Sequence, residues 1–191
     1  MNTDVALRPP LSPLLYRPLL ERALAEDLGT AGDLTTDALV PAGDRGAASI
    51  VCRQAGRVAG LDVAAAAFQM VDPSVVVRLM VADGADAAEG QVLARVEGPT
   101  RALLTAERTA LNVLGRLCGI ATATRDLVAL VAPHGTRVLC TRKTTPGLRA
   151  LEKYAVRMGG GVNHRFGLAD GVLIKDNHLA AAGGVEVAVR R

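Results

Sequence analysis

Aromatic side chains are nearly absent from this sequence of 191 residues, which has no Trp, two Tyr and two Phe. Half of the residues are hydrophobic, and most of that apolar content is Ala, Val and Leu. A chain of this length can bury a substantial core in one large domain or two small ones. A core of small aliphatic side chains favours helices packed on strands over an aromatic-rich β-sandwich.

Cysteines are also few, since Cys52, Cys118 and Cys140 are widely spaced and form no Cys-X-X-Cys or Cys/His pattern. Their spacing argues against a zinc site or a disulfide framework and favours small core residues. No stretch reaches the roughly 18 uninterrupted apolar residues of a membrane span, and no basic segment followed by an apolar run opens the chain. We therefore expect a cytoplasmic protein without a signal peptide or a membrane segment.

An excess of charge of one sign is lacking as well, because the formal net charge is only +3. The chain has no run of Lys and Arg and no aromatic platform for bases, which argues against nucleic acid as a partner. Basic residues do gather between Arg137 and His178, where there are eight Lys/Arg and three acids. Such a cluster inside an apolar, Gly-rich segment indicates a site for anions.

The first part of the chain, residues 1–111, is expected to form an α+β domain with an antiparallel sheet. After a Pro-rich tail that ends at Pro13, helical spacing of apolar residues predicts a helix over residues 14–28. Asp33 to Thr36 is a predicted turn. The further elements predicted here are a helix at 63–71 and strands at 47–53, 75–81 and 91–96.

A long helix should follow this domain. A stripe of apolar residues predicts that it begins at Thr100 and runs to Cys118, where Gly119 should break it. A second helix is predicted over residues 121–131, and we place the domain boundary between residues 111 and 112.

Residues 112–191 should then build the first part of an α/β barrel. Predicted strands alternate here with predicted helices, the strands at 137–141 and 171–174 and the helices at 148–158 and 185–191. This alternation is typical of a parallel α/β sheet or barrel, but only two strand–helix units are present. The expected fold class is therefore α/β, with an N-terminal α+β sandwich domain followed by an incomplete α/β barrel.

The segment TRKTTPGLR, residues 141–149, follows a predicted strand and opens a predicted helix. In a parallel α/β fold this position is the carboxyl end of a strand, where ligands bind. The adjacent cations Arg142 and Lys143, the Thr hydroxyls and the helix amides would suit carboxylates or phosphates. A solvated loop with a capping Thr explains the same composition equally well.

Three further clusters carry polar chemistry. His164 and Arg165 follow a triple glycine, which lets backbone approach a ligand closely. Lys175 closes an apolar strand and precedes Asp-Asn-His, which packing alone does not explain. Arg108 lies in the long helix, where an intrahelical ion pair is the commoner role. No P-loop, dinucleotide fingerprint or nucleophile elbow is present, so the sequence indicates polyanion binding rather than covalent catalysis.

Three segments of the chain resemble the quinolinate phosphoribosyltransferase family, also called carboxylating nicotinate-nucleotide pyrophosphorylases. They are TRKTTPGLRALEKYAVRMGGGVNHRFGLADGVLIKDNH, the preceding LLTAERTALNVLGRLCGIAT and the N-terminal EDLGTAGDLTTDALV. Together they cover nearly the whole chain, and the long cationic motifs are highly specific. The resemblance implies a pentosyltransferase of NAD biosynthesis that joins quinolinate to 5-phosphoribosyl pyrophosphate and releases nicotinate mononucleotide, carbon dioxide and pyrophosphate.

The resemblance also implies roles for the residues of these motifs. Lys143, Lys175 and His164 would be the catalytic residues, and Lys143 would face the phosphorylated sugar. The residues implied in substrate binding are Arg108, Thr141, Arg142, Lys143, His164, Arg165 and Lys175.

The family resemblance further implies a cofactor and a partner. Mg²⁺ would accompany phosphoribosyl pyrophosphate, and the family works as homodimers or higher homo-oligomers. Arg108 would reach into the site of the neighbouring subunit.

Two features depart from the family pattern. Cys140 stands where the family more usually has Asp, which removes one anchor for the loop. The chain also lacks the C-terminal region that, in the family, supplies the acidic residues for ribose and Mg²⁺ and a Gly-rich phosphate loop. We therefore expect no metal ligands in the residues present and interpret the chain as cut short. Two alternatives stay open: a pyrophosphorylase-like paralogue of molybdate-transport operons, and a non-catalytic remnant that dimerises or binds anions.

These expectations predict the behaviour of the isolated 191-residue chain. We expect it to be oligomeric or poorly soluble, because parallel strands without neighbours leave an open edge and an apolar patch. We also expect no detectable nicotinate mononucleotide in a turnover assay with quinolinate, phosphoribosyl pyrophosphate and Mg²⁺. Size-exclusion chromatography beside that assay tests both points, and a soluble, monomeric and active chain would contradict them.

Overall fold

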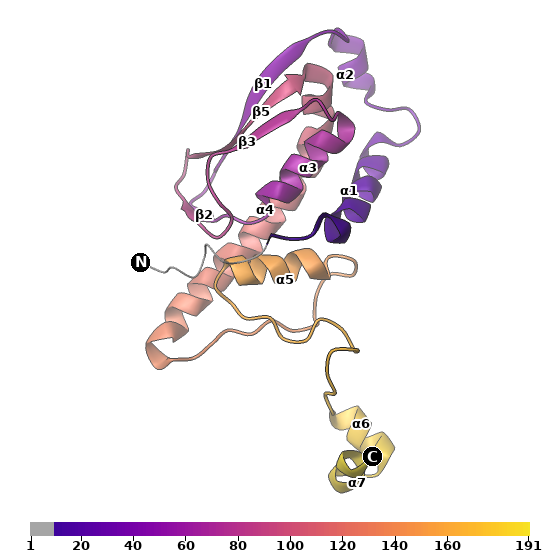
Figure 1. The fold of residues 1–191 in the computed structure, drawn as a ribbon, viewed down its shortest axis with the longest axis vertical. Helices are drawn as coiled ribbons and strands as arrows, with labels where there is room; N and C mark the ends of the chain where they lie inside the picture. Colours follow the sequence, from indigo (N-terminus) through magenta and orange to yellow (C-terminus); the bar gives the residue numbers. More distant parts are fainter. Residues whose placement is uncertain (1–9) are drawn as a thin grey trace.

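A computed structural model describes residues 10–191, so most of the expected Pro-rich tail lies outside the described residues. Its helices are α1 (Pro13–Leu28), α2 (Leu34–Leu39), α3 (Leu61–Val71), α4 (Thr100–Val131), η1 (Ala132–His134), α5 (Arg149–Met158), α6 (Asp176–Ala182) and α7 (Val185–Arg190). Its strands are β1 (Arg45–Val51), β2 (Gly56–Arg57), β3 (Val76–Leu79), β4 (Asp86–Ala87) and β5 (Val92–Pro99). Figure 1 shows the upper body formed by the N-terminal elements, with α5 beneath it and α6 and α7 apart at the bottom.

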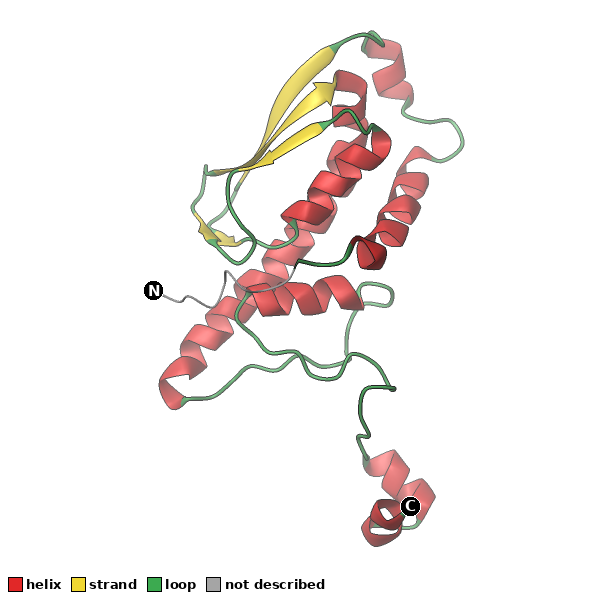
Figure 2. Ribbon diagram, in the orientation of Figure 1, coloured by secondary structure: helices red, strands yellow, loops and turns green. Residues whose placement is uncertain are grey.

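The main sheet is antiparallel and has the strand order β1-β5-β3. Its register places Ala47 of β1 and Val76 of β3 on either side of Glu97 in β5. Figure 2 shows α3 and α4 on one face of this sheet. The α+β sandwich domain predicted from the sequence is therefore confirmed, including all three longer strands, although their ends differ by a few residues.

The core of this domain is built from small side chains, as the composition predicted. Ala64 and Ala67 of α3 and Ala106 and Ala110 of α4 are fully buried. Small residues at these positions let the two helices approach closely. Gly60, just before α3, has φ +96°, and a Cβ there would lie 2.5 Å from Cδ1 of Leu117. Its left-handed conformation therefore favours glycine, and any side chain there would also displace Leu117.

The turn expected at Asp33 to Thr36 is instead the start of α2. The Asp33 carboxylate accepts a hydrogen bond from the Thr36 N–H at 3.0 Å. This is an N-cap interaction, which satisfies an amide that has no partner inside the helix. A turn and a capped helix begin with the same local geometry, so the sequence did not distinguish them.

The break expected at Gly119 is wrong, because α4 is one helix of 32 residues. Glycine in a helix interior costs only about 1 kcal/mol relative to alanine. The burial of neighbouring Leu117 and Ala121 more than offsets that cost. The helix also runs through the boundary that we placed between residues 111 and 112, and that boundary stays a prediction.

The predicted barrel strands at 137–141 and 171–174 do not form in the described residues. Leu139 instead makes a single parallel bridge to Val162, and α5 lies between these two residues along the chain. The second parallel segment therefore follows the glycine run directly, about ten residues earlier than predicted. The predicted helix between the two parallel segments is confirmed as α5, and the chain is an α/β protein with an incomplete barrel.

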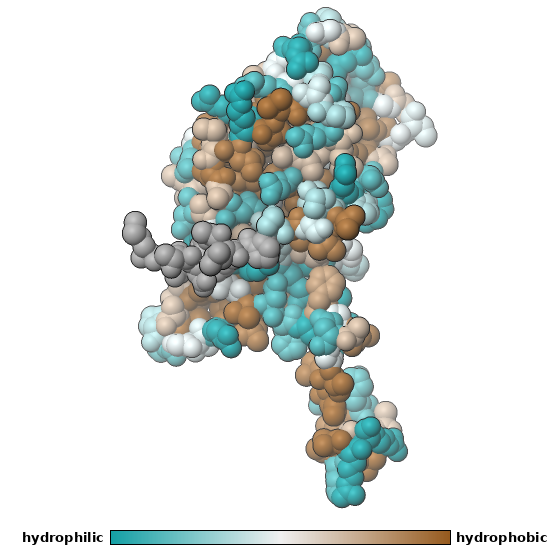
Figure 3. Space-filling view, in the orientation of Figure 1, coloured by the Kyte–Doolittle hydropathy of each residue, from teal (hydrophilic) through white to brown (hydrophobic). Residues whose placement is uncertain are grey.

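Residues 171–174 remain extended and exposed instead of forming a strand. Val172 is 94 % exposed, and Figure 3 shows brown apolar side chains along the narrow stretch that leads to α6 and α7. A parallel strand forms only with hydrogen-bonded neighbours and covering helices, and this stretch has none in the described residues. Helix α6, which the sequence did not predict, begins directly after Lys175.

No helix in the described part of the chain combines the length and the hydropathy required to cross a membrane.

The continuous α4 leads to a stability prediction. Gly119→Ala should raise the free energy of unfolding by up to about 1 kcal/mol, because alanine has the higher helix propensity. A Cβ there would meet no atom within 4 Å. The measurement is urea unfolding followed by circular dichroism.

Gly159→Ala is the matched comparison, because a Cβ at Gly159 would collide with the Ala121 carbonyl oxygen and lie 2.6 Å from Cβ of Thr124. We expect this variant to be destabilised. A loss of stability in Gly119→Ala would indicate that α4 is broken at Gly119 after all.

Candidate cationic site around α5

The loop at residues 141–148 connects the bridge at Leu139 to α5 and is held by its own side chains. The Thr141 hydroxyl accepts a hydrogen bond from the Lys143 N–H at 3.0 Å, and the Thr144 hydroxyl accepts one from Nε of Arg149 at 3.1 Å. These are local turn contacts of the kind that Thr favours. They define the backbone path of the loop and leave the Lys143 side chain exposed.

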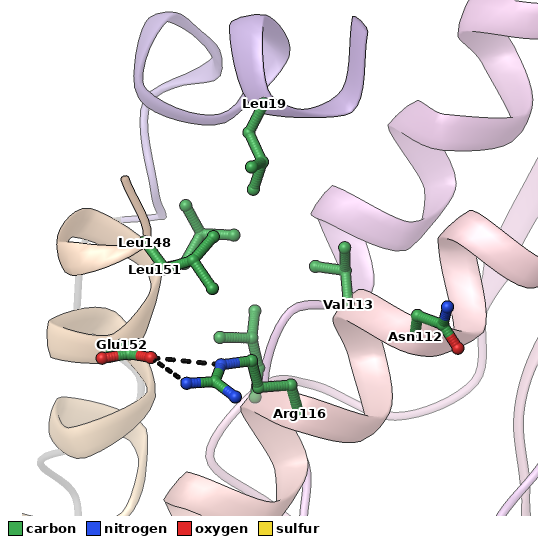
Figure 4. Close-up of a pocket in the computed structure, with 8 residues that line it drawn as sticks. Leu19, Asn112, Val113, Arg116, Leu148, Leu151 and Glu152 are labelled. Carbon is green, nitrogen blue, oxygen red and sulfur yellow. Dashed lines mark hydrogen bonds and ion pairs between the residues drawn. The ribbon is translucent and has the colours of Figure 1, made fainter. Parts of the chain in front are cut away.

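Glu152 of α5 connects this loop to α4. Its carboxylate accepts hydrogen bonds from the Thr145 N–H at 3.1 Å and from Nε of Arg116 at 3.1 Å. A second guanidinium nitrogen of Arg116 bonds both Glu152 and the Thr145 hydroxyl. Figure 4 shows this pair closing one side of a small apolar pocket between α1, α4 and α5.

The electrostatics of Glu152 follow from this geometry. Burial by itself raises the pKa of this carboxyl. The hydrogen bonds from Arg116 and Thr145 and the charge of Arg116 outweigh burial, so the pKa lies below its ordinary value. Glu152 therefore carries its negative charge at neutral pH, although it is only 8 % exposed.

Lys153, the next residue of α5, connects the loop to a second segment. Its side chain is 3 % exposed. Its ammonium donates to Sγ of Cys140 at 2.9 Å and to the carbonyl oxygen of His164 at 3.0 Å. The His164 N–H also points to the Cys140 sulfur, at 3.4 Å. The segments at 140 and 164, far apart in the sequence, therefore lie side by side.

Tyr154, the third residue of this run, connects α5 to the N-terminal domain. Its hydroxyl donates to the Asp83 carboxylate at 2.6 Å. The same carboxylate accepts the N–H groups of Gly60 and Leu61 at the start of α3, at 2.7 and 3.1 Å. Burial, followed by the hydrogen bond and the charge of Asp83, raises the pKa of Tyr154 well above its ordinary value, so the phenol stays a donor.

The segment after His164 is also organised by charge. Arg165 donates to the Gly171 carbonyl oxygen at 2.8 Å, and Asp170 accepts the N–H of Gly167 at 2.8 Å. The backbone amides of Phe166 and Gly167 lower the pKa of Asp170. Arg149 of α5 lies over the Phe166 ring, 5.9 Å from its centroid. This segment therefore packs back on α5.

The structure places some of the predicted site residues together and separates others. An opening of about 480 Å³ beside the loop is lined by Thr141 and Lys143, together with Arg116, Lys153, Thr144 and Thr145. Lys153 brings the backbone of His164 to the edge of this opening. Arg142 lies in the same loop, and its Nε is buried without a hydrogen-bond partner in the described residues.

The other predicted residues lie elsewhere. Arg165 lines a separate opening of about 360 Å³, beside the apolar stretch 172–174 and His178. The Lys175 N–H donates to Nδ1 of His178 at 2.9 Å, where α6 begins. Arg108 is exposed on α4. The described residues do not bring these three side chains into the opening at Lys143.

The sequence did not single out Arg116, Glu152 and Lys153. The helix predicted at residues 148–158 is present as α5, and its apolar face is buried at Leu151, Ala155 and Met158. Glu152 and Lys153 lie off that face and are nevertheless buried, at 8 % and 3 % exposure. They are buried because α4 covers one side of α5 and the two loops cover another. Helical periodicity predicts the face that packs on a neighbouring helix, but it does not predict where a distant loop will pack.

Metal binding finds no support in the residues of this site. Within residues 10–191 no group of three or more His, Cys, Asp and Glu side chains could hold a metal ion.

A layered α+β domain followed by cationic loops at two parallel segments defines an α/β protein with an incomplete barrel. Models of the quinolinate phosphoribosyl transferase family match the chain over most of its length, the N-terminal domain at residues 33–118 and the C-terminal domain at residues 120–191. The chain belongs to the quinolinate phosphoribosyl transferase family.

Individual relatives agree with this assignment. The chain is 50 % identical over 176 residues to the nicotinate-nucleotide pyrophosphorylase [carboxylating] of Mycobacterium leprae, covering 91 % of this chain and 62 % of that protein. It is 46 % identical over 177 residues to a probable nicotinate-nucleotide pyrophosphorylase [carboxylating] of Synechocystis, covering 93 % and 59 %. The chain therefore spans about three fifths of the length of these relatives.

Solved structures show the same fold. NadC from Streptococcus pyogenes superposes with a TM-score of 0.91 at 39 % identity, over 96 % of this chain and 65 % of that one. The nicotinate-nucleotide pyrophosphorylase from Francisella tularensis superposes with a TM-score of 0.87 at 38 % identity, over 99 % of this chain and 66 % of that one.

The buried Glu152 leads to a pH-dependent prediction. Glu152→Gln should destabilise the chain by about 1.5–3 kcal/mol at neutral pH, because charge-assisted hydrogen bonds are lost. A carboxyl with a depressed pKa stabilises the fold above its unfolded-state pKa, and that stabilisation is lost as pH falls through the folded-state pKa. The difference between wild type and variant should therefore shrink as pH falls below 4.5, the ordinary value for Glu.

Urea unfolding at a series of pH values measures this difference. Glu186→Gln is the matched control, because its ion pair with Arg190 in α7 is exposed on both sides. Exposed pairs contribute about 0–1 kcal/mol, so its effect should be small. Equal effects of the two substitutions would contradict the role of Glu152.

Proposed function

We propose that this chain carries part of the active site of a quinolinate phosphoribosyltransferase, an enzyme of NAD biosynthesis. The reaction joins quinolinate to 5-phosphoribosyl pyrophosphate and releases nicotinate mononucleotide, carbon dioxide and pyrophosphate. The observation that carries the proposal is the pair of cationic loops held together by Lys153, in a chain that belongs to this family.

The substrates explain why such loops are cationic. Quinolinate is a dicarboxylate, and its partner carries a phosphate and a pyrophosphate. Arg142 supports carboxylate binding because its buried Nε has no acceptor within the described residues. A carboxylate beside that guanidinium would supply one and could form a bidentate pair.

We assign the remaining roles in the same way. Arg165, His164 and Lys175 would bind quinolinate with Arg142, and Thr141 would shape their loop. Lys143, exposed at the opening, would face the phosphorylated sugar. Arg165 and Lys175 would have to lie closer to Lys143 than they do in this structure to share one site.

The chemistry is electrostatic. The pyridine nitrogen forms a bond to C1′ of the ribose as the bond from C1′ to the pyrophosphate oxygen breaks. The C2 carboxylate then leaves as carbon dioxide, its bonding electrons stay on the ring carbon, and a proton replaces it. The positively charged ring nitrogen, the cations Lys143 and Lys175 and a hydrogen bond from His164 would stabilise those electrons.

Mg²⁺ is proposed as the companion of the pyrophosphate group. The described residues offer no cluster of carboxylates that fits it, so we assign no step to the metal.

A homodimer or higher homo-oligomer is proposed as the working assembly, with exposed Arg108 reaching the neighbouring site. The cytoplasm is the proposed location, which the three free cysteines support.

The carboxylate-binding role of Arg142 is directly testable. Arg142→Ala should weaken quinolinate binding by about 2–5 kcal/mol, because a buried carboxylate would lose its charged partner. Isothermal titration calorimetry with quinolinate measures the effect, and Arg137→Ala, an exposed arginine before the loop, is the control.

Nicotinate provides a second comparison, because it lacks one of the two carboxylates. We expect wild type to bind quinolinate more tightly than nicotinate. Equal affinities would favour the paralogue of molybdate-transport operons, and an unchanged quinolinate affinity in Arg142→Ala would exclude the proposed role of that arginine.

A further inference from the structure

Lys153 is an unusual residue for the interior of a helix-packed site. It is 3 % exposed, and its ammonium contacts a thiol sulfur and a carbonyl oxygen. No carboxylate of the described residues forms an ion pair with it. Burying an ammonium without a carboxylate partner is costly, and hydrogen bonds to a sulfur and a carbonyl oxygen offset only part of that cost.

The two acceptors of Lys153, Sγ of Cys140 and the His164 carbonyl oxygen, belong to the two cationic segments. Cys140 directly precedes the loop that carries Thr141, Arg142 and Lys143. The His164 carbonyl belongs to the segment that carries Arg165. A single ammonium, carried by α5, therefore contacts both cationic segments at once.

Cys140 is the other half of this connection. Its sulfur accepts hydrogen bonds from Lys153 and from the His164 N–H, and its thiol donates to Oδ1 of Asn163 at 3.4 Å. Every one of these contacts crosses from the 140 segment to α5 or to the 163–164 segment. The parallel bridge from Leu139 to Val162 is the backbone continuation of the same contact.

We propose that Lys153 is a positioning residue for quinolinate binding, which acts through Cys140 and His164 by holding the two cationic segments at a fixed separation. This inference rests on the proposed function. The positive charge of Lys153 also lies at the wall of the opening that Lys143 lines, so it favours an anion there.

Hydrogen exchange tests the positioning role without any ligand. In Lys153→Met the amides of residues 140–145 and 163–166 should exchange faster together, by about tenfold or more, because the contact that joins them is lost. The amides of α3 and of the first half of α4 should be unchanged. Cys140→Ala should give the same pattern, because it removes the other partner of the same hydrogen bond. Cys140 is less buried than Lys153, so this variant provides the test if Lys153→Met does not fold. Cys52→Ala is the matched thiol control.

Quinolinate affinity tests the functional part. Both Lys153→Met and Cys140→Ala should raise the dissociation constant by about tenfold to a hundredfold, which is the usual effect of losing a charge-assisted hydrogen bond. Cys140→Asp, unlike Cys140→Ala, should bind quinolinate at least as tightly as wild type, because a carboxylate accepts from Lys153 more strongly than sulfur does. The double variant with Lys153→Met and Cys140→Asp should bind quinolinate as weakly as Lys153→Met alone, since the new carboxylate would have no ammonium partner.

The outcomes separate the two proposals. Unchanged exchange in both segments, or exchange that quickens in only one of them, overturns the positioning role. Faster exchange in both segments with quinolinate affinity within about twofold of wild type overturns the link to binding. If wild type itself binds no quinolinate, the proposed function and the link to quinolinate both fail, and exchange alone decides whether Lys153 couples the segments.

Discussion

Three consecutive polar side chains of α5, Glu152, Lys153 and Tyr154, are buried, and the arrangement of the molecule depends on them. A polar group removed from water must find partners inside the protein, or it costs several kcal/mol. Each of these three finds partners on a different segment. Glu152 bonds Arg116 of α4 and the Thr145 loop, Lys153 bonds the 140 and 164 segments, and Tyr154 bonds Asp83 beside α3.

This requirement explains how a chain with few aromatic residues positions a charged site. Small aliphatic side chains pack α3 against α4 closely, but they provide little directional information. Hydrogen bonds from buried donors and acceptors do provide it, because each has a narrow range of productive distances and angles. The helix α5 lies between the N-terminal domain and the loops. Tyr154 bonds to the domain, and Glu152 and Lys153 bond to the loops.

The balance of charge around α5 has a functional consequence. Glu152 is the one buried carboxylate of the described residues, and it is occupied by Arg116 and Thr145. Glu152 therefore neutralises Arg116 of α4 and, within the part of the chain that the structure describes, forms no ion pair with the cations of the two loops. The loop cations have no such buried counter-charge among residues 10–191, which suits a site whose substrates are polyanions.

The sequence by itself determined the fold class, the order of most helices and strands and the segments that carry the cations, because these follow from local periodicity, glycine positions and specific motifs. The family was also accessible from the motifs around Arg142 and His164. Only the tertiary structure decided that α4 continues through Gly119, that Val162 supplies the second parallel segment, and that Glu152 and Lys153 are buried. Those outcomes depend on contacts between residues distant in the chain, such as Arg116 with Glu152 and Cys140 with Lys153. Local patterns do not encode which surface of a helix a distant loop will cover, so the residues that hold this site together emerged only from its packing.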